Sequence, residues 1–355
     1  MDDIYAIILS KLNLQSLLTM RNVSRWYDDR ISNKKLNKQF PYAIRMDQFE
    51  NFKQINNGKG IKNIGYGYRY TGNYDENTNL FFLPNLTKLE IFIPPNNILL
   101  HMHHKIDITD ELISQLTQLT DLIFTCDGIT NNGLKTLTNL KTLGIHQNDK
   151  ITNDILTNFP KLTKLELFCN NITDEGLSKL TNLKFLSIFD DYSNNFTDLS
   201  IKKLTALTDL YIKNTNFITT ESVRFLTRLK KLSMFQMNEI TNEALRELSN
   251  LELLYLGYCK KITDEGLTLL TNLTGLNLDG MHDITIKGVN TLSKLTGLCT
   301  LYDLNDHISD HSNLNKEIKL FCSSCVHRLG TYDSYDHFDS DTNYYNSLNN
   351  CGCAQ

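Results

Sequence analysis

The side chains best suited to metal chemistry are cysteines near the end of the chain. A Cys-x-x-Cys pair, Cys322 and Cys325, precedes a Cys-x-Cys pair, Cys351 and Cys353, and His327 lies between them. Four thiolates can hold Zn²⁺ in a tetrahedron. However, Cys-x-Cys is not the usual second pair of a zinc site, and the segment between the pairs is rich in Tyr, Asp, Asn and Ser. The favoured interpretation is therefore a capping segment followed by a flexible acidic tail, with no metal bound.

Three histidines, His101, His103 and His104, form the other candidate for a metal site. Imidazole is a common metal ligand, but no carboxylate or thiol at a recognised spacing completes a ligand set. These histidines fall in a predicted insertion over 94–105, so we interpret them as part of a solvated loop. The sequence predicts no cofactor.

No constellation of catalytic residues stands out. The sequence contains no glycine-rich phosphate-binding loop, no G-x-S-x-G motif and no H-E-x-x-H motif. Its acidic residues recur with a repeat, at positions that suit the starts of helices, and none is unique to one segment. We therefore expect no enzymatic activity.

Charge and hydropathy limit the classes of partner. With 36 Lys+Arg against 40 Asp+Glu, the chain lacks the basic field that drives binding to nucleic acids. No apolar run approaches the roughly 18 residues that span a bilayer, and the first residues carry no basic targeting segment. Four cysteines lie at scattered repeat positions without the paired spacing of a disulfide framework, namely Cys126, Cys169, Cys259 and Cys299. We expect a soluble cytoplasmic protein that binds neither nucleic acid nor membrane; the nucleus, or a host cytoplasm for a viral protein, are the alternatives.

The dominant feature of the chain is an apolar triplet, L-x-x-L-x-L/I, that recurs about every 22 residues. Self-similarity on this period predicts a stacked solenoid, and solenoids offer long surfaces for binding other macromolecules. The triplets begin at Leu86, Leu119, Leu140, Leu162, Leu183, Leu207, Leu229, Leu251, Leu273 and Leu295.

The physical logic of one repeat is clearest over 251–272. Leu254 and Leu256 are separated by a residue of the opposite face, as in a short strand with one buried side. Thr263 follows at a position that predicts a helix N-cap, with acidic residues after it in the first turn, where carboxylates favour the helix dipole. Leu267 then marks the buried side of a brief helix. Each cycle thus predicts a strand, a turn, a short helix and a return.

These repeats resemble the leucine-rich repeats, over roughly 86–301. The segment 251–272 is similar to the cysteine-containing subtype, with Cys259 nine positions into the repeat, although other repeats carry Met or Asn there. The resemblance implies an α/β solenoid of about ten repeats. A curved parallel β-sheet would form its concave side and short helices its convex side.

The first forty residues have a pattern of their own. Their apolar residues recur at helical spacing, which predicts three short helices. A segment this short buries little surface alone and usually needs a partner or an adjoining domain. We therefore interpret residues 1–40 as a small all-α docking module.

The order of residues in this module resembles an F-box. The run Ile8 to Leu12 is similar to the family's I-F-S-x-L, and Leu17 and Leu18 are similar to its paired leucines. The family's tryptophan position holds Tyr27, with a tryptophan one place earlier. The resemblance implies binding to the adaptor Skp1 of a cullin-based ubiquitin ligase; the alternative is an ordinary helical cap on the solenoid. The residues assigned to adaptor binding are Ile4, Ile8, Leu9, Leu12, Leu17, Leu18, Val23, Trp26 and Tyr27.

The open face of the predicted sheet supplies the candidate target-binding surface. Side chains inside or directly after each triplet would point away from the core, and strands about 4.8 Å apart would align the aromatic ones into a stripe. An exposed aromatic patch favours a binding surface; the alternative is that some phenylalanines pack at strand ends against neighbouring repeats. The predicted target-binding residues are His146, Glu166, Phe168, Phe189, Tyr211, Lys213, Phe235 and Tyr255.

Together these features predict the substrate-recognition subunit of an SCF-type (Skp1, cullin and F-box) ubiquitin ligase, whose concave face binds an unknown target protein. The alternative is a leucine-rich-repeat scaffold for protein–protein interaction that has no link to ubiquitin. The predicted domains are an F-box-like module over 1–40, a linker or degenerate first repeat over 41–85, the solenoid over 86–301, a C-terminal cap over 302–329 and a flexible acidic, cysteine-containing tail over 330–355.

Overall fold

A computed structural model gives the structure of the chain, which divides into two compact units, Met1–Asn171 and Ile172–Gln355. The predicted module over 1–40, the histidine cluster and the cysteines beyond 321 lie outside the residues that the structure describes. The described residues are 63–67, 87–92, 109–125, 127–189, 195–301, 314–315 and 318–321.

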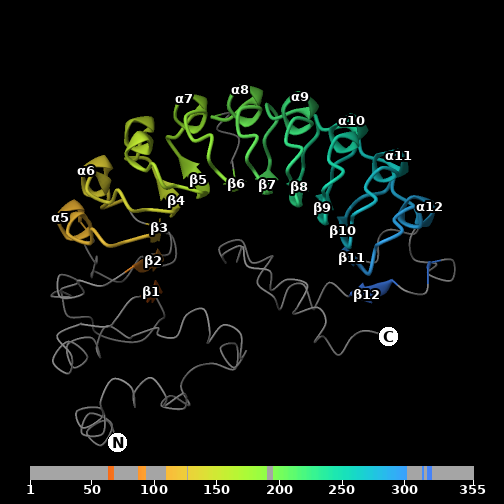
Figure 1. Cartoon of the computed structure of the whole chain (residues 1–355), viewed down its shortest axis with the longest axis horizontal. Coiled ribbons are helices and arrows are strands. Elements are labelled where there is room, and N and C mark those ends of the chain that lie inside the picture. The colour runs from red at the N-terminus through yellow and green to blue at the C-terminus, as the bar shows by residue number, and fades with distance from the viewer. Residues whose placement is uncertain are drawn as a thin grey trace, which may run out of the picture. The chain divides into compact units, whose positions relative to one another are not determined.

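The N-terminal unit contains a parallel sheet with short helical segments on one side (Figure 1). Its described strands pair in chain order, each parallel to the next. The strands are β1 (Asn63–Gly67), β2 (Lys88–Phe92), β3 (Asp121–Thr125), β4 (Thr142–Asn148) and β5 (Lys164–Asn170). The helices are α5 (Asp110–Ser114), α6 (Asn131–Leu134) and the 3₁₀ helix η4 (Asn153–Asn158).

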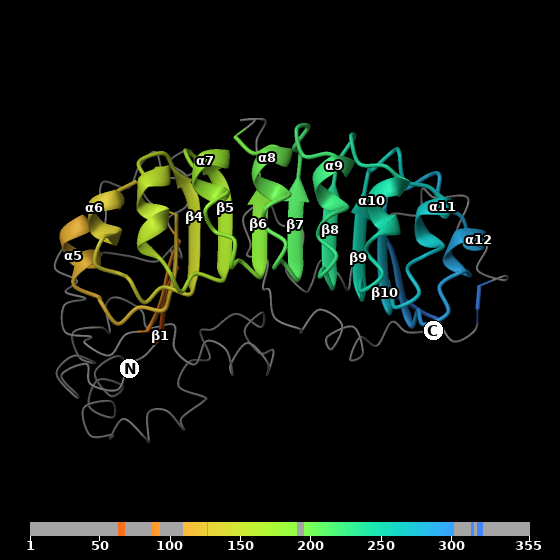
Figure 2. The ribbon, with the colours of Figure 1, turned by 45° about the horizontal axis from the view of Figure 1, so that its top comes forward.

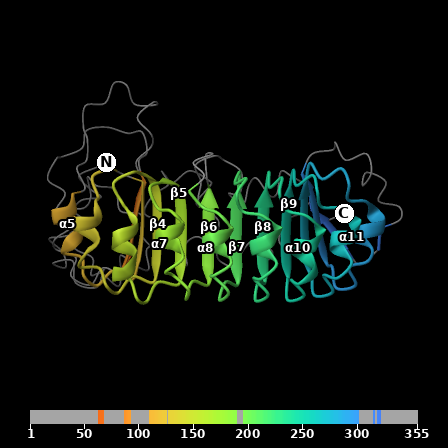
Figure 3. The ribbon, with the colours of Figure 1, turned by 90° about the horizontal axis from the view of Figure 1, so that it is seen from above.

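The C-terminal unit repeats the same arrangement. Its strands run side by side in one direction (Figure 2), and its helices cover one side of them (Figure 3). The strands are β6 (Phe185–Phe189), β7 (Asp209–Lys213), β8 (Lys231–Phe235), β9 (Leu253–Gly257), β10 (Gly275–Asp279), β11 (Gly297–Leu301) and β12 (Lys319–Phe321). The helices are α7 (Asp174–Leu177), α8 (Asp198–Ile201), α9 (Thr220–Val223), α10 (Asn242–Arg246), α11 (Asp264–Leu267) and α12 (Ile286–Val289).

The predicted α/β leucine-rich-repeat architecture is confirmed for the described residues. Parallel pairing also extends beyond the predicted solenoid range, because β1 pairs with β2 at one end and β12 pairs with β11 at the other. The five domain boundaries themselves stay predictions.

The core of each unit contains the apolar residues of the triplets together with apolar residues of the turns and helices. From Leu119 to Leu295, the first leucine of every triplet is at most 3 % exposed. Burying one such side chain stabilises the fold by about 1.5–3 kcal/mol. Because each leucine packs between its own repeat and the next, this stabilisation is shared by neighbouring repeats.

A polar ladder joins consecutive helices on the side opposite the sheet's open face. The first residue of one helix binds the threonine that precedes the next helix. Asp198, for example, accepts hydrogen bonds from the backbone N–H of Thr219 at 2.8 Å and from its hydroxyl at 2.7 Å. The other rungs of this ladder are Asp110 with Thr130, Asn131 with Thr152, Asp174 with Thr197, Thr220 with Thr241, Asn242 with Thr263, and Asp264 with Thr285.

This ladder corrects the predicted role of Thr263. Thr263 occupies the N-cap position of α11, but its hydroxyl makes no capping hydrogen bond and instead accepts one from the amide of Asn242 at 3.0 Å. Thr219, by contrast, donates its hydroxyl proton to Asp198 and accepts from the N–H of Glu221 at 3.1 Å. A carboxylate forces the hydroxyl to donate, which leaves its lone pairs for the helix.

Loss of the Asp198 carboxylate should destabilise the C-terminal unit. We expect Asp198→Ala to lower the free energy of unfolding by about 1–3 kcal/mol, because the N–H and hydroxyl of Thr219 lose their acceptor. Asp198→Asn should cost less than about 1 kcal/mol, since an amide can accept from the N–H as Asn242 does. Urea unfolding followed by circular dichroism measures both changes.

Asp283→Ala is the matched control, because Asp283 is exposed and should leave the unfolding midpoint unchanged. Equal midpoints for Asp198→Ala and this control would contradict a stabilising role for the ladder.

Candidate protein-binding surface

The open face of the sheet carries the side chains that alternate with the core leucines. In β7, Leu210 and Ile212 are at most 2 % exposed, whereas Tyr211 and Lys213 between and after them are only half-buried. Strand β9 repeats this alternation at Tyr255, whereas the central residues of β3, β5, β6, β8 and β10 are buried. The open face can be described as two rows of residues. The middle row holds the central residue of each strand, and the end row holds the residue that follows the last core position.

In the N-terminal unit, three predicted residues come together around one carboxylate. Glu166 lies between Lys164, whose Nζ is 3.0 Å from Oε1, and His146, whose Nε2 is 3.6 Å from Oε2. The imidazole of His146 also meets the ring of Phe168 edge-on, with centroids 6.4 Å apart. His146, Glu166 and Phe168 therefore form one cluster, with the carboxylate at its centre.

Glu166 is buried, in contrast to the other predicted target-binding residues. Only 6 % of it is exposed, and such burial alone would raise the pKa of its carboxyl group. The hydrogen bond from His146 and the charge of Lys164 outweigh this effect and lower the pKa to about 2. Glu166 thus fixes the positions of His146 and Lys164 rather than offering a free charge to a ligand.

In the C-terminal unit, the end row places a lysine between two phenylalanines. Lys213 pairs in register with Phe189 on one side and Phe235 on the other. Its ammonium lies 4.9 Å from the centre of the Phe235 ring, a cation–π distance. Phe235 covers Gly257, where a Cβ atom would approach the ring to 2.4 Å, so the small residue makes room for the aromatic one.

The middle row of the same unit contains the two predicted tyrosines, separated by Ser233. Tyr211 packs against Phe185 with ring centroids 5.2 Å apart. The hydroxyl of Tyr255 lies 3.5 Å from a carboxylate oxygen of Asp279, which is 2 % exposed. Both tyrosines are therefore held by neighbours and present only part of each ring to solvent.

The predicted aromatic stripe is thus two interrupted rows within the C-terminal unit. Lys213 separates Phe189 from Phe235, and a serine separates the tyrosines, because parallel register places equivalent residues of adjacent strands side by side. Phe168 belongs to the N-terminal unit.

The remaining predicted sites lie elsewhere. All nine residues assigned to adaptor binding fall outside the described residues. Among the described residues, no group of three His, Cys, Asp or Glu side chains could hold a metal ion. The helices described are also too short or too polar to cross a bilayer.

Cys259 is a core residue. It is fully buried, and its thiol contacts the backbone carbonyls of Met234 and Gly257 at 3.5 and 3.4 Å. Burial raises the pKa of this thiol to about 11, so the nucleophilic thiolate is scarce at neutral pH.

Sequence reasoning missed a polar groove beside the end row. It is formed by turns that follow β7, β8 and β9, and amide side chains dominate its lining. The available signal was the recurrence of Asn or Gln directly after consecutive strands, at Asn214 and Gln236.

Comparison with known proteins agrees with this architecture. The family described as "Leucine Rich repeat" matches residues 160–180 and 247–271. A comparison with curated proteins found no match. The described part of the chain thus has the leucine-rich-repeat fold, and two of its repeats match the family model.

Solved structures with the same fold include Rad7 from yeast, in a complex with Elc1. It is 19% identical, covers 68% of this chain and 68% of its own, and has a TM-score of 0.52. The internalins inlF and inlC2 of Listeria monocytogenes are 22% and 27% identical. InlF covers 74% of this chain and 96% of its own at a TM-score of 0.41, and inlC2 covers 54% and 84% at 0.42.

Replacing Glu166 should change how stability depends on pH. Its folded pKa lies below the ordinary value of 4.5, so the carboxylate stabilises the fold above pH 4.5 and this contribution is lost as the pH falls toward 2. We expect Glu166→Gln to lower the free energy of unfolding at pH 7 by about 1–3 kcal/mol. Urea unfolding at a series of pH values should show this difference shrinking below pH 4.5.

Glu175→Gln provides the control, since the exposed pair of Glu175 with Lys179 at 3.4 Å should contribute less than about 0.5 kcal/mol. A Glu166→Gln difference that stays constant from pH 7 to pH 2.5 would show that the charge of Glu166 has no such role.

Proposed function

We propose that this protein is the substrate-recognition subunit of an SCF-type ubiquitin ligase. Residues 1–40 bind the adaptor Skp1, and the open face of the sheet binds a target protein. The chain itself performs no catalysis and works in the cytoplasm.

The observation that carries this proposal is the order of residues in the first forty positions. The sequence from Ile8 to Leu12 and the paired leucines Leu17 and Leu18 resemble the F-box order. The family's tryptophan position departs from that order, because it holds Tyr27, with Trp26 one place earlier. The repeat array then follows in the same chain. An adaptor-binding module joined to a long binding surface has the two contacts that a ligase receptor needs.

The open face supports the second contact. Phe189, Tyr211, Phe235 and Tyr255 are half-buried, so each retains ring surface that a partner can cover. Aromatic residues are the commonest hot spots of protein interfaces, where truncating one costs about 2 kcal/mol or more. Lys213 adds a cation at the centre of this surface, which favours a partner with a negative charge there.

The similarity to Rad7 is consistent with a fold that can be part of a protein complex, because that structure was determined with Elc1. At 19% identity it supports the fold and leaves the partner of this chain to experiment.

A pull-down of purified Skp1 tests the proposal. The intact chain should retain Skp1, and the double variant Leu17→Asp, Leu18→Asp should lose it, because two carboxylates would enter an apolar contact. The control is Leu199→Asp, which changes a leucine that is 61 % exposed on α8 and should bind Skp1 like the intact chain.

Absence of Skp1 binding by a well-folded intact chain would overturn the proposal. The protein would then be a leucine-rich-repeat scaffold whose N-terminal residues serve another purpose. Equal loss in the Leu17, Leu18 double variant and in Leu199→Asp would point to misfolding of both.

A further inference from the structure

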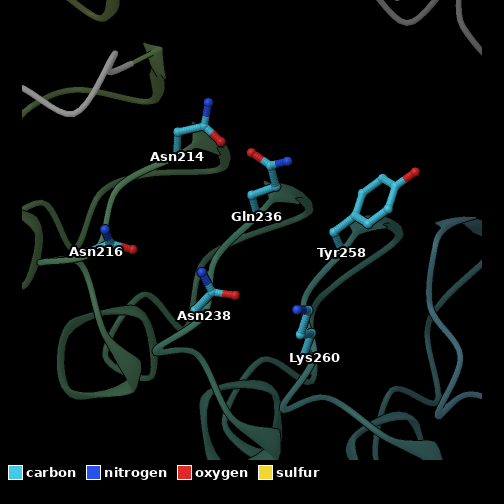
Figure 4. A pocket seen from close by; sticks show the side chains of 6 residues that line it. All are labelled: Asn214, Asn216, Gln236, Asn238, Tyr258 and Lys260. Carbon is cyan, nitrogen blue, oxygen red and sulfur yellow. The ribbon is translucent and has the colours of Figure 1, made fainter.

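A polar groove of about 320 Å³ runs across the turns that follow β7, β8 and β9. Its side chains form two rows (Figure 4). One row is made by the residue directly after each strand, and the second row by the residue two positions later. The first row is Asn214, Gln236 and Tyr258, and the second is Asn216, Asn238 and Lys260.

The backbone holds the first row in register. Asn214, Gln236 and Tyr258 all have a left-handed backbone conformation, with φ of 58°, 54° and 51°. Each N–H donates to a carbonyl at the end of the next strand, at 3.0, 2.7 and 2.8 Å respectively. The three side chains therefore follow one another at the spacing of parallel strands, about 4.8 Å.

Tyr258 is an unusual residue for this position. A left-handed conformation costs an L-residue about 1–2 kcal/mol, and Asn or Gly tolerates it best. The equivalent residues after β7, β8 and β10 are Asn214, Gln236 and Gly280. Tyr258 is nevertheless an aromatic residue that is 38 % exposed, with its ring edge-on to Phe235 at 5.4 Å. Strained residues of this kind cluster at ligand-binding positions.

The remaining lining offers neutral hydrogen-bonding groups. The four Asn and Gln side chains each present one acceptor and two donors, which are the groups that pair with a peptide main chain. The Oδ1 atom of Asn214 is buried and accepts no hydrogen bond from the described residues. This oxygen is therefore closed to a ligand, and the side chain of Asn214 offers its two amide donors instead.

Charge makes the groove attractive to an anion. Lys260 forms no ion pair within the part of the chain that the structure describes, whereas its neighbour in sequence, Lys261, pairs with Glu239 at 2.9 Å. The groove lining contains no carboxylate. The ammonium of Lys213, over the Phe235 ring, lies in the end row of the same repeats.

We propose that this groove binds an extended peptide segment that carries an acidic side chain. The amides bind its main chain, Lys260 pairs with its carboxylate, and Tyr258 contacts a neighbouring side chain. A neutral glycan would leave the charge of Lys260 without a partner. A nucleic acid would require more cations than this groove offers. The inference rests on the proposed function in one respect, since it takes the target to be a protein.

Selection from a phage library of random linear dodecapeptides tests this assignment. The full chain is immobilised, and enriched peptides are synthesised and titrated by fluorescence anisotropy. We expect them to be enriched in Asp and Glu. Changing the acidic residue of a peptide to its amide should weaken binding about tenfold, as should Lys260→Met or Asn238→Asp in the protein.

Two further variants separate a binding role from a structural one. Tyr258→Asn introduces the residue type found at the equivalent position 214, which has the same backbone conformation. The variant should keep the thermal midpoint of the intact chain, yet its affinity for the selected peptides should fall several-fold. His282→Ala, at the position equivalent to Lys260 in the next repeat and exposed, should change neither property.

Three results would overturn the assignment. One is that no peptide is enriched over an unrelated protein; the second is that enriched peptides bind all groove variants as they bind the intact chain. The third is binding to a glycan array that the groove variants abolish, which would make the ligand a carbohydrate. Skp1 retention, measured on the same variants, should be unaffected, so failure of the groove and failure of the ligase proposal give different results.

Discussion

The structure depends on the fact that no single repeat can bury its own leucines. From Leu119 to Leu295, the first leucine of each triplet lies between its own repeat and the next, and only stacking brings it to the observed exposure of 3 % or less. Apolar contact alone would allow neighbouring repeats to slide, because it is non-directional. The hydrogen bonds from the N–H and hydroxyl of Thr219 to Asp198, and their equivalents along the chain, add the direction that fixes each repeat on the next.

The sequence was sufficient to predict the repeated elements because their signals are local and recur. The triplets mark the strands, and a threonine that follows an apolar residue marks each described helix start, most often as Ile-Thr-Asp or Ile-Thr-Asn. The sequence did not show which hydrogen-bond or ion-pair partner each polar side chain has in the folded chain. Thr263 has the sequence of an N-cap, but its hydroxyl bonds to Asn242 of the preceding repeat, a choice that depends on Asn rather than Asp standing 21 residues earlier. The sequence likewise suggests that Glu166 is an exposed charge, whereas in the structure its carboxylate lies between Lys164 and His146.

The candidate binding surface also has features that the sequence predicts and features that depend on how neighbouring strands are aligned. The alternation of each strand correctly predicted that Tyr211 and Lys213 face away from the core, and parallel register then decides that Lys213 interrupts the aromatic row. The recurrence of Asn214 and Gln236 after consecutive strands was the sequence signal for the groove, but its shape depends on the left-handed turns after β7, β8 and β9. Its six side chains come from three repeats and meet only because the strand ends are aligned. Rigid strands thus hold a half-buried aromatic surface and a polar groove side by side, within reach of one extended partner.

The central claim is that adaptor and target use different parts of the chain. Cross-linking of the intact chain to Skp1 with an amine-reactive reagent, read by mass spectrometry, tests it most directly. We expect adaptor cross-links at Lys11, Lys34 and Lys35, and none at Lys213 or Lys260 beside the open face. Cross-links concentrated at Lys213 and Lys260 would place the adaptor on the repeats and contradict the account.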